Sequence, residues 1–389
     1  MESLVRVMFN SQIFCHQRFG GVSRYFTSLV RSMDAIEDVQ PLVVAPLHFN
    51  DYLDSLPHHL VYGKKISWLE KAPGVAYAAG AIPGRIAGRR FKPAIVHNTY
   101  YFPERQVPRA ALILTVYDMI HEKYPNYFRT GSLIARWKAR CVAQADHVIC
   151  ISENTRRDVI EAYGIAESRT SVTHLACETF ESHVGAETSA SFKLRSFGTD
   201  TPYLLFVGSR AGHKNFVGLL GAYAASEWLR NNFLLVCFGG GEFTSAERAA
   251  ISKAQLESRV KHVGGTGGTD AALGSCYLHA ALFVYPSHYE GFGLPLLEAM
   301  SLGCPVACSA GGSFPEIAGD AARMFDSTSV ESIRDVLESV LSSSSDIAAL
   351  IERGRIRQRL FSWRKCAEQT VAVYRRVLAD QPPDVRLRR

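Results

Sequence analysis

The most specific spacing of chemically capable residues lies in a nine-residue segment that begins and ends with glutamate. The segment comprises Glu290, Gly291, Phe292, Gly293, Leu294, Pro295, Leu296, Leu297 and Glu298. The glycines allow the backbone to approach a ligand closely, and a proline fits the first turn of a helix. Free N–H groups at such a helix start favour anionic oxygens, so the two carboxylates would orient other parts of the same elongated ligand. The spacing alone fits equally well a strand–loop–helix corner with capping glutamates.

A second segment, from Gly208 to Asn215, places two cations in a turn between an apolar strand and a helix. Ser209 opens the turn, and Arg210 and Lys214 are its cations. A planar guanidinium and a point-charge ammonium together suit a diphosphate. The G-x-x-x-x-G-K-[ST] order of a phosphate-binding P-loop is absent. A surface turn with two solvated cations is the alternative.

A third segment places Gly20 and Gly21 at the start of a long helix, after the first strand. A phosphate or a sugar would fit at such a helix start. The segment lacks the complete G-x-G-x-x-G order, and so does the glycine run 239–241 that follows a later strand. A nicotinamide dinucleotide site is therefore poorly supported.

A fourth, polar cluster follows the apolar strand 112–116. Asp118 and His121 are candidates for holding a sugar hydroxyl or an acceptor, and His97 ends the preceding strand. A loop with a helix-capping aspartate explains the same residues. No H-E-x-x-H helix, G-x-S-x-G elbow or aspartate cluster appears, so we predict neither a resident metal nor a cofactor.

These segments need strands and helices to position them. Short apolar runs alternate with helical periodicity, which predicts an α/β protein with parallel sheets and crossover helices. The polar stretch 178–200 interrupts the alternation. We predict a first domain over 1–180, a linker over 181–200, a second domain over 201–365 and a C-terminal helical segment over 366–389. Ligands of such domains bind at the carboxyl ends of the strands, here expected to face a cleft.

Composition narrows the class of protein. The 389 residues are 47% hydrophobic and 21% charged, with nine cysteines that form no C-x-x-C pair. We expect reduced thiols, a cytoplasmic location and neither a signal peptide nor a membrane-spanning helix. Residues 1–180 hold 21 Lys and Arg against 16 Asp and Glu, whereas the remainder is nearly balanced. The basic half is either a solvated face or a patch that docks on a membrane; nucleic-acid binding lacks any recognisable module.

Taken together, the Glu290–Glu298 motif, the Arg210/Lys214 turn and the segment 19–26 resemble the retaining glycosyltransferases of family 4, which have the GT-B fold. The segment Phe19–Phe26 is similar to that of bacterial mannosyl- and rhamnosyltransferases of surface polysaccharide synthesis, such as O-antigen synthesis. The resemblance implies two Rossmann-like domains facing across a cleft, with the C-terminal helix crossing back to the first. It also implies a nucleotide-sugar donor, with GDP-mannose or a GDP-deoxyhexose as the first choice. The expected acceptor is a glycan or a lipid-linked oligosaccharide, and the protein is expected to make peripheral contact with the cytoplasmic membrane.

The resemblance assigns roles residue by residue. Glu298 would bind the donor ribose, and Glu290 would lie beside the donor sugar. Arg210 and Lys214 would neutralise the leaving diphosphate. The resemblance further assigns donor contacts to Gly20, Gly21, Ser209, Val263, Gly264, Gly291, Phe292, Gly293 and Leu294. Family members often carry His-Asp where this chain has Tyr117-Asp118, so Tyr117, Asp118 and His121 remain alternatives for the sugar contact, and Asp118 is our choice.

The predicted activity is metal-independent hexosyl transfer with retention of configuration. Two alternatives remain open at this stage. One is a nucleotide-sugar epimerase or hydrolase of the same fold, and the other is a nucleotide-sugar-binding protein without catalytic activity.

Overall fold

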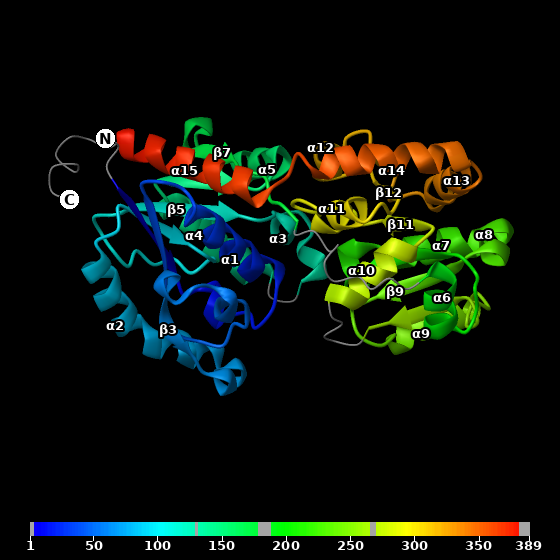
Figure 1. Ribbon diagram of the computed structural model, residues 1–389, viewed down its shortest axis with the longest axis horizontal. Coiled ribbons are helices and arrows are strands. Elements are labelled where there is room, and N and C mark those ends of the chain that lie inside the picture. Colours follow the sequence, from blue (N-terminus) through cyan, green and yellow to red (C-terminus); the bar gives the residue numbers. More distant parts are fainter. Residues whose placement is uncertain (1–3, 129–130, 178–187, 265–269, 381–389) are drawn as a thin grey trace. The chain divides into compact units, whose positions relative to one another are not determined.

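The computed structural model describes residues 4–128, 131–177, 188–264 and 270–380. The chain divides into two compact units (Figure 1). The first contains Met1–Leu175 together with Ser362–Arg389, and the second contains Ala176–Phe361. Each unit is a parallel β-sheet with helices on its faces, so the predicted α/β class is confirmed.

The first unit has a seven-stranded sheet in the order β3-β2-β1-β4-β5-β6-β7. Its strands are β1 (Val5–Asn10), β2 (Val39–His48), β3 (Val61–Lys65), β4 (Ile95–Asn98), β5 (Ala111–Val116), β6 (His147–Cys150) and β7 (Thr170–Val172). Its helices are α1 (Gly21–Met33), α2 (Pro73–Phe91), α3 (Ile120–Lys123), α4 (Gly131–Gln144), α5 (Glu153–Tyr163) and α15 (Trp363–Ala379).

The second unit has a six-stranded sheet in the order β10-β9-β8-β11-β12-β13. Its strands are β8 (Tyr203–Val207), β9 (Leu234–Phe238), β10 (Val260–Val263), β11 (Leu282–Tyr285), β12 (Val306–Ser309) and β13 (Arg323–Phe325). Its helices are α6 (Ser189–Phe197), α7 (Phe216–Ala225), α8 (Glu227–Asn232), α9 (Ser245–Lys253), α10 (Asp270–His279), α11 (Leu294–Ser301), α12 (Phe314–Ala318), α13 (Val330–Leu341) and α14 (Ser344–Gln358).

Both sheets follow from the residue pattern. Strands β4, β5, β9 and β11 are buried along their whole length, as expected for central parallel strands covered on both faces. Helix α1 buries Tyr25, Phe26, Leu29, Val30 and Met33, which fall on one face at helical spacing. Helix α15 packs against α1 and therefore belongs to the first unit, although it comes last in the chain.

The predicted linker over 181–200 needs correction. Residues 178–187 lie outside the described part of the chain, but Ser189–Phe197 form helix α6. The hydroxyl oxygen of Thr188 accepts a hydrogen bond from the Ser191 N–H and so caps this helix. Phe192 is buried and its ring lies 4.9 Å from that of His279. The polar composition of the stretch concealed a short helix that packs on the second unit.

Candidate functional site

The strongest candidate site lies where the second sheet reverses its strand order. Strands β8 and β11 are neighbours, and from them the sheet is built outward in both directions. Such a switch point leaves a crevice at the carboxyl ends of the strands, where ligands of open α/β sheets bind. Lys214 follows β8 and Glu290 follows β11. The topology therefore brings together two residues that are 76 positions apart in the sequence.

Lys214 and Glu290 form a partly buried ion pair at this edge. The Lys214 Nζ lies 2.6 Å from Glu290 Oε1, and the two side chains are 19% and 15% exposed. The same ammonium lies 3.4 Å from the Tyr285 hydroxyl and 5.5 Å from the centre of that ring. Partial burial strengthens electrostatic interactions while the groups remain within reach of a ligand. The pair can therefore present one cation and one carboxylate to a single polar ligand.

Hydrogen bonds to backbone carbonyl groups hold the loops that carry this pair. The Asn215 side chain donates from Nδ2 to the carbonyl oxygens of Pro286 (3.2 Å) and Ser327 (2.8 Å). The His288 N–H donates to the His213 carbonyl at 2.8 Å and so joins the two loops directly. These contacts fix the Lys214 turn against the Glu290 loop, which is the rigidity that a binding site requires.

The main chain around Glu290 is closely packed. The Ser313 hydroxyl donates to the carbonyl oxygens of Glu290 (3.0 Å) and Phe292 (2.8 Å). A Cβ at Gly312 would lie 3.0 Å from the Glu290 nitrogen, so this position tolerates only glycine without a shift. Gly293 has φ +101 and precedes α11 as its N-cap. Its left-handed conformation favours glycine, as the sequence predicted for a close backbone approach.

Helix α11 carries the second glutamate of the motif. It begins at Leu294 with Pro295 in its first turn, in agreement with the sequence prediction. Glu298 lies one turn into the helix and is only 7% exposed, and Tyr277 donates to Glu298 Oε2 at 3.4 Å. Gly291 and Phe292 are buried and Leu294 is half-buried. The Phe292 ring packs against Phe361, so only the backbone of Phe292 is suited to a ligand.

The structure corrects the expectation for Arg210. Its side chain is 2% exposed and forms an ion pair with Glu247 at 3.0 Å. Its remaining guanidinium N–H groups donate to the carbonyl oxygens of Gly239 (2.8 Å), Gly240 (3.4 Å), Gly241 (2.7 Å) and Glu242 (3.0 Å). The guanidinium also covers the Phe243 ring at 4.8 Å. Arg210 therefore holds the glycine-rich loop after β9 and does not project toward a diphosphate.

Glu247 is the anionic partner that makes this arrangement stable. Burial acts to raise its pKa, but hydrogen bonds from Thr244 and the Arg210 guanidinium bring the pKa below its usual value. Glu247 also completes a capping box with Thr244 at the start of α9. The turn from Gly208 to Asn215 gives no sign of this partner, because Glu247 lies 37 residues downstream of Arg210.

The remaining predicted donor contacts lie at neighbouring strand ends. Ser209 is exposed in the turn after β8. Val263 ends β10 and is half-buried, and Gly264 follows with φ +78. A Cβ at Gly264 would lie 3.1 Å from the Phe238 ring, which explains the glycine by packing. The structure thus places all of these residues at the carboxyl ends of strands in the second sheet.

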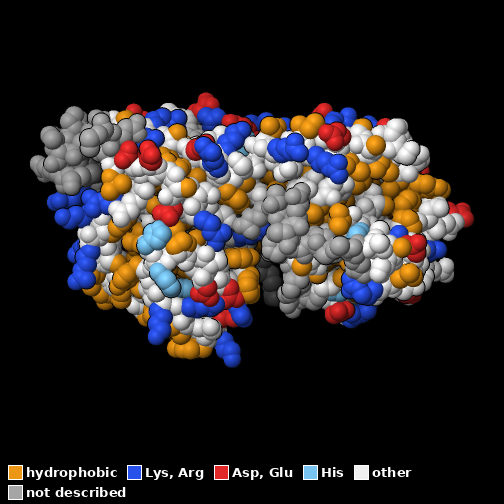
Figure 2. Space-filling model, in the orientation of Figure 1, with side chains coloured by type: hydrophobic (Ala, Val, Ile, Leu, Met, Phe, Trp, Pro, Cys, Tyr) orange, Lys and Arg blue, Asp and Glu red, His pale blue; other side chains and the backbone are white. Residues whose placement is uncertain are grey.

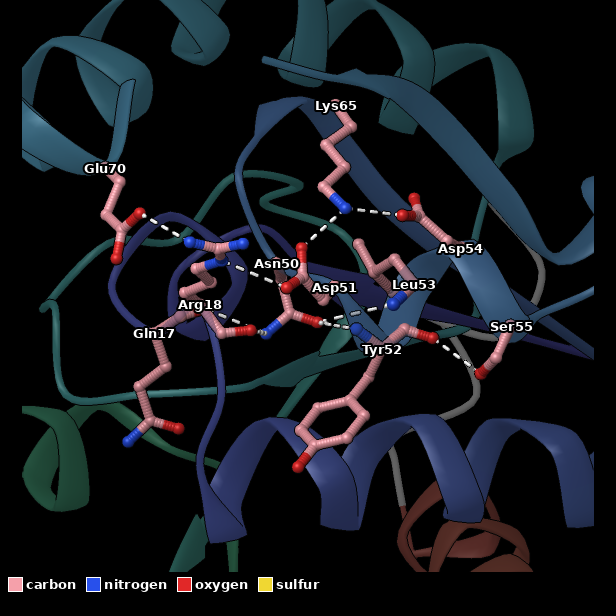
Figure 3. A network of polar contacts seen from close by, with 10 residues as sticks. All are labelled: Gln17, Arg18, Asn50, Asp51, Tyr52, Leu53, Asp54, Ser55, Lys65 and Glu70. Atoms are coloured by element: carbon pink, nitrogen blue, oxygen red, sulfur yellow. Dashed lines mark hydrogen bonds and ion pairs between the residues drawn. The ribbon is translucent and has the colours of Figure 1, made fainter. Parts of the chain in front are cut away.

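In the first unit, Gly20 and Gly21 lie at the start of α1, and a polar network holds the preceding loop (Figure 3). Asn50 donates from Nδ2 to the carbonyl oxygens of Gln17 (2.8 Å) and Arg18 (3.1 Å). Arg18 in turn pairs with Asp51 at 3.0 Å. A Cβ at Gly21 would meet no atom within 4 Å, so its surroundings are open.

Asp118 lies at the start of α3 beside a buried lysine, Lys138, that no sequence motif marks. Asp118 Oδ1 accepts from the Ile120 N–H at 3.1 Å and lies 3.8 Å from Lys138 Nζ. Lys138 is fully buried, and it donates to the Asp118 carbonyl at 2.8 Å and to Glu122 at 2.9 Å. The Asp118 side chain remains 35% exposed, so it stays available to a ligand while Lys138 fixes its backbone.

His121, the neighbouring candidate, is half-buried. Its ring lies 4.5 Å from that of Phe128. Burial lowers its pKa, and Nδ1 is buried with no hydrogen-bond partner among the described residues. His121 therefore remains a candidate for a polar ligand contact.

His97 and Tyr117 need correction. His97 is fully buried, with Nδ1 2.6 Å from the Tyr374 hydroxyl and Nε2 2.8 Å from the Thr115 hydroxyl. Burial lowers the pKa of His97 to about 3, so the ring is neutral. Tyr117 is also buried, and its hydroxyl donates to the Thr99 carbonyl at 3.2 Å. Both side chains stabilise the core beneath α15 and do not reach an acceptor.

Comparison with known proteins identifies the family of this chain. The family described as "Glycosyltransferase Family 4" matches residues 19–179, and the family "Glycosyl transferases group 1" matches residues 189–357. The chain belongs to these glycosyltransferases. The two matches leave residues 180–188 between them.

Two relatives from Escherichia coli are mannosyltransferases by name. The O-antigen chain mannosyltransferase B is 27% identical over 372 residues, which cover 91% of this chain and 96% of the relative. The serotype-specific mannosyltransferase WbdA is 28% identical over 239 residues, which cover 60% of this chain and 29% of that longer protein.

Solved structures show the same fold. Sucrose-phosphate synthase from Thermosynechococcus elongatus has a TM-score of 0.76 at 19% identity and covers 97% of this chain and 100% of its own. Anabaena HepE in complex with UDP-glucose has a TM-score of 0.70 at 16% identity and covers 95% of this chain and 98% of its own. WaaG, a glycosyltransferase involved in lipopolysaccharide biosynthesis, has a TM-score of 0.68 at 17% identity, covering 95% of this chain and 99% of its own. The predicted GT-B fold is confirmed.

Proposed function

We propose that this glycosyltransferase moves a hexose, mannose or a deoxyhexose, from a GDP-linked donor to a glycan or lipid-linked oligosaccharide acceptor, with retention of configuration and without a metal. The observation that carries the proposal is the Lys214–Glu290 pair at the switch point of the second sheet, 2.6 Å apart and partly buried. The mannosyltransferase names of the two Escherichia coli relatives support the choice of sugar.

The pair suggests how a donor would be held. A diphosphate is a stronger anionic partner for Lys214 than a single carboxylate, because it offers several charged oxygens. Lys214 would therefore turn to the diphosphate, and Glu290 would be released to accept hydrogen bonds from sugar hydroxyls. The ammonium and the first N–H groups of α11 would then stabilise the charge that develops on the leaving diphosphate.

The acceptor hydroxyl attacks the anomeric carbon from the face that the diphosphate leaves. The C–O bond to the acceptor forms, the C–O bond to the diphosphate breaks, and a leaving phosphate oxygen takes the acceptor proton. Glu298, buried on α11 beside Tyr277, would bind the donor ribose. Asp118, Gly20 and Gly21 of the first unit stay predicted contacts of the sugar and the phosphate.

No metal is part of the proposal. Among the described residues, no group of three or more His, Cys, Asp or Glu side chains could hold a metal ion. The chain's own cation, Lys214, is the group proposed to neutralise the diphosphate. Turnover that survives a strong chelator is the result expected, and loss of turnover that added Mg²⁺ or Mn²⁺ restores would overturn this part.

A melting-temperature panel of GDP-, UDP-, ADP- and TDP-sugars tests the donor. A ligand at about 100 times its Kd stabilises the folded state by about 2.7 kcal/mol, which shifts the melting temperature of a unit this size by roughly 5–10 °C. We expect the largest shift with GDP-mannose or a GDP-deoxyhexose. A shift with UDP-sugars alone would contradict the GDP assignment, and sugar release without any acceptor would indicate a hydrolase.

A further inference from the structure

Lys138, on helix α4 of the first unit, is a lysine without contact with solvent. Lys and Arg side chains are almost never fully buried unless they are paired, and Figure 2 shows many of them at the surface of this molecule. Among the described residues, only Lys138 and Arg210 are buried cations of this kind. Arg210 holds the glycine-rich loop of the second unit. Lys138 is therefore the one buried cation in the described part of the first unit.

The Lys138 ammonium lies between two carboxylates that differ in exposure. Its Nζ donates to Glu122 Oε2 at 2.9 Å and lies 3.8 Å from Asp118 Oδ1. The Glu122 side chain is 13% exposed, and its other oxygen accepts from the Tyr163 hydroxyl at 2.6 Å. The Asp118 side chain is 35% exposed. Lys138 and Glu122 therefore offset one another inside the protein, and the remaining negative charge of the three groups is that of Asp118, at the surface.

The same ammonium helps to fix the main chain around Asp118. Lys138 Nζ donates to the Asp118 carbonyl oxygen at 2.8 Å. On the other side, the Tyr117 N–H donates to the Tyr101 hydroxyl at 3.1 Å, and the Tyr101 ring centre lies 5.2 Å from Lys138 Nζ. The Asp118 carboxylate itself accepts from the Ile120 N–H at 3.1 Å. Hydrogen bonds thus hold the chain before and after Asp118, which limits the directions that its carboxylate can take.

An apolar side chain in place of Lys138 could not perform both tasks. Taking a lysine out of water costs free energy, and a well-packed apolar residue is often as good or better for stability. Methionine, however, would leave the Glu122 carboxylate without a cation and the Asp118 carbonyl without a donor. The two carboxylates would then repel one another beside a main chain that is no longer held. The control that the buried charge gives over Asp118 therefore explains why a lysine is present.

We propose that Lys138 is a positioning residue for sugar transfer. It anchors the Asp118 main chain and offsets Glu122, so that the Asp118 carboxylate is held in place for a hydroxyl of the transferred sugar. Tyr117 is buried, so Asp118 is the member of the Tyr117-Asp118 pair that a ligand can reach. Lys138 does not touch the ligand and acts only through Asp118. The proposal rests on the proposed function in one respect, the contact between Asp118 and the sugar.

A double-mutant cycle between Lys138 and Asp118 tests the proposal by steady-state kinetics, with the donor that the melting panel selects. Asp118→Asn should lower kcat/KM about 30-fold, the loss expected for a hydrogen bond to a charged acceptor. Lys138→Met should lower kcat/KM by a similar factor and divide the loss between kcat and KM in the same proportion. In the Asp118→Asn background, Lys138→Met should lower kcat/KM by less than about threefold, because its effect passes through a carboxylate that is no longer there.

Lys123→Met is the matched control, because Lys123 also lies beside Asp118 in sequence and pairs with a buried carboxylate. Its Nζ lies 2.6 Å from Asp158 Oδ1, and the Asp158 side chain is 7% exposed. Both lysine variants should lower the melting temperature, but Lys123→Met should keep kcat/KM within about twofold. If Lys138→Met does not fold, Lys138→Met/Glu122→Gln takes its place in the cycle, because that variant leaves no unpaired Glu122 carboxylate inside the protein.

Two kinetic outcomes would overturn the proposal. Equal losses from Lys138→Met with and without Asp118→Asn would make Lys138 purely structural, and unchanged kcat/KM in Asp118→Asn would leave it nothing to position. A crystal structure of Lys138→Met gives a readout without turnover: we expect the chain over 118–122 to move while β5 keeps its place, and an unmoved chain would contradict positioning. Turnover with a donor other than a GDP-sugar would count against the proposed donor alone, because the cycle works with any donor.

Discussion

Both sheets present polar residues where parallel strands end, but the two edges differ in what covers them. At the β8/β11 edge, Lys214 and Glu290 remain partly exposed and face one another. At the β4/β5 edge, His97 and Tyr117 are buried in the core, and the hydroxyl of Tyr374 on α15 forms a hydrogen bond with the His97 ring. A strand-end position therefore brings residues together, whereas the elements packed above it decide which of them can meet a ligand.

The largest effect is expected at the open edge. Lys214→Ala removes the cation proposed to stabilise the leaving diphosphate, and we expect kcat to fall roughly 100- to 1,000-fold. The loss should appear in kcat more than in donor affinity, because the charge is greatest in the transition state. Steady-state kinetics with the donor identified by the melting panel provide the measurement, with Lys253→Ala on α9 as the control. An unchanged kcat would remove Lys214 from the chemistry.

Arg210 provides a contrast within the same turn, since it is buried four residues before Lys214. Arg210→Met leaves the half-buried Glu247 without its cation and frees four carbonyl groups, so we expect a loss of about 3 kcal/mol in unfolding free energy. Chemical denaturation measures this loss. Arg210→Met/Glu247→Met should recover part of it. A variant with full stability and a collapsed kcat would restore Arg210 to the donor site.

The burial of His97 at the β4/β5 edge should make the free energy of unfolding depend on pH. The pKa of His97 falls from 6.5 to about 3 in the folded protein because the ring is buried. Between these values the unfolded chain binds a proton that the folded chain does not, so stability is full above pH 6.5 and falls as the pH is lowered. At pH 4.5 the loss from His97 amounts to roughly 2–3 kcal/mol.

Denaturation of the unaltered chain and of His97→Gln at several pH values measures this effect. The variant should be less stable at pH 7 but should lose less stability on acidification. His147, whose pKa burial lowers to about 4, acts in the same direction and keeps some slope in the variant. Parallel curves for the two proteins would mean that His97 is not the group that titrates.

Local sequence was sufficient to predict the parts of the fold that depend on local periodicity. Each of the strands at Tyr203–Val207, Leu234–Phe238 and Leu282–Tyr285 is a short apolar run between turns, which is the pattern that predicts a buried parallel strand. Strand β3 (Val61–Lys65) escaped prediction because it is an edge strand with exposed, polar residues. Helix α6 escaped because Phe192 is its single buried residue, so no apolar periodicity marks it.

The site was predictable where its parts lie close in sequence and failed where partners are distant. The segment from Glu290 to Glu298 is one loop and one helix, so its conformation could be inferred from glycine and proline positions. The burial of Arg210 depends on Glu247, and that of His97 depends on Tyr374, 277 residues away. Residue type and strand-end position alone do not distinguish a cation that meets a ligand from one that holds a loop.

The smallest effect, expected at Glu298, separates binding from chemistry at the open edge. Glu298 is 7% exposed on α11 and is proposed to accept hydrogen bonds from the donor ribose, far from the bond that breaks. Glu298→Gln keeps the shape of the side chain but removes its charge, so donor Kd should rise about tenfold while kcat changes little. Calorimetric titration of the donor, together with kcat at saturating donor, measures both quantities. A donor with a 2′,3′-dideoxyribose should bind equally weakly to both proteins, because the carboxylate then has no hydroxyl to hold. If Glu298→Gln lowered kcat as strongly as Lys214→Ala, the carboxylate would act on the reacting groups, and the separation of roles along α11 would be wrong.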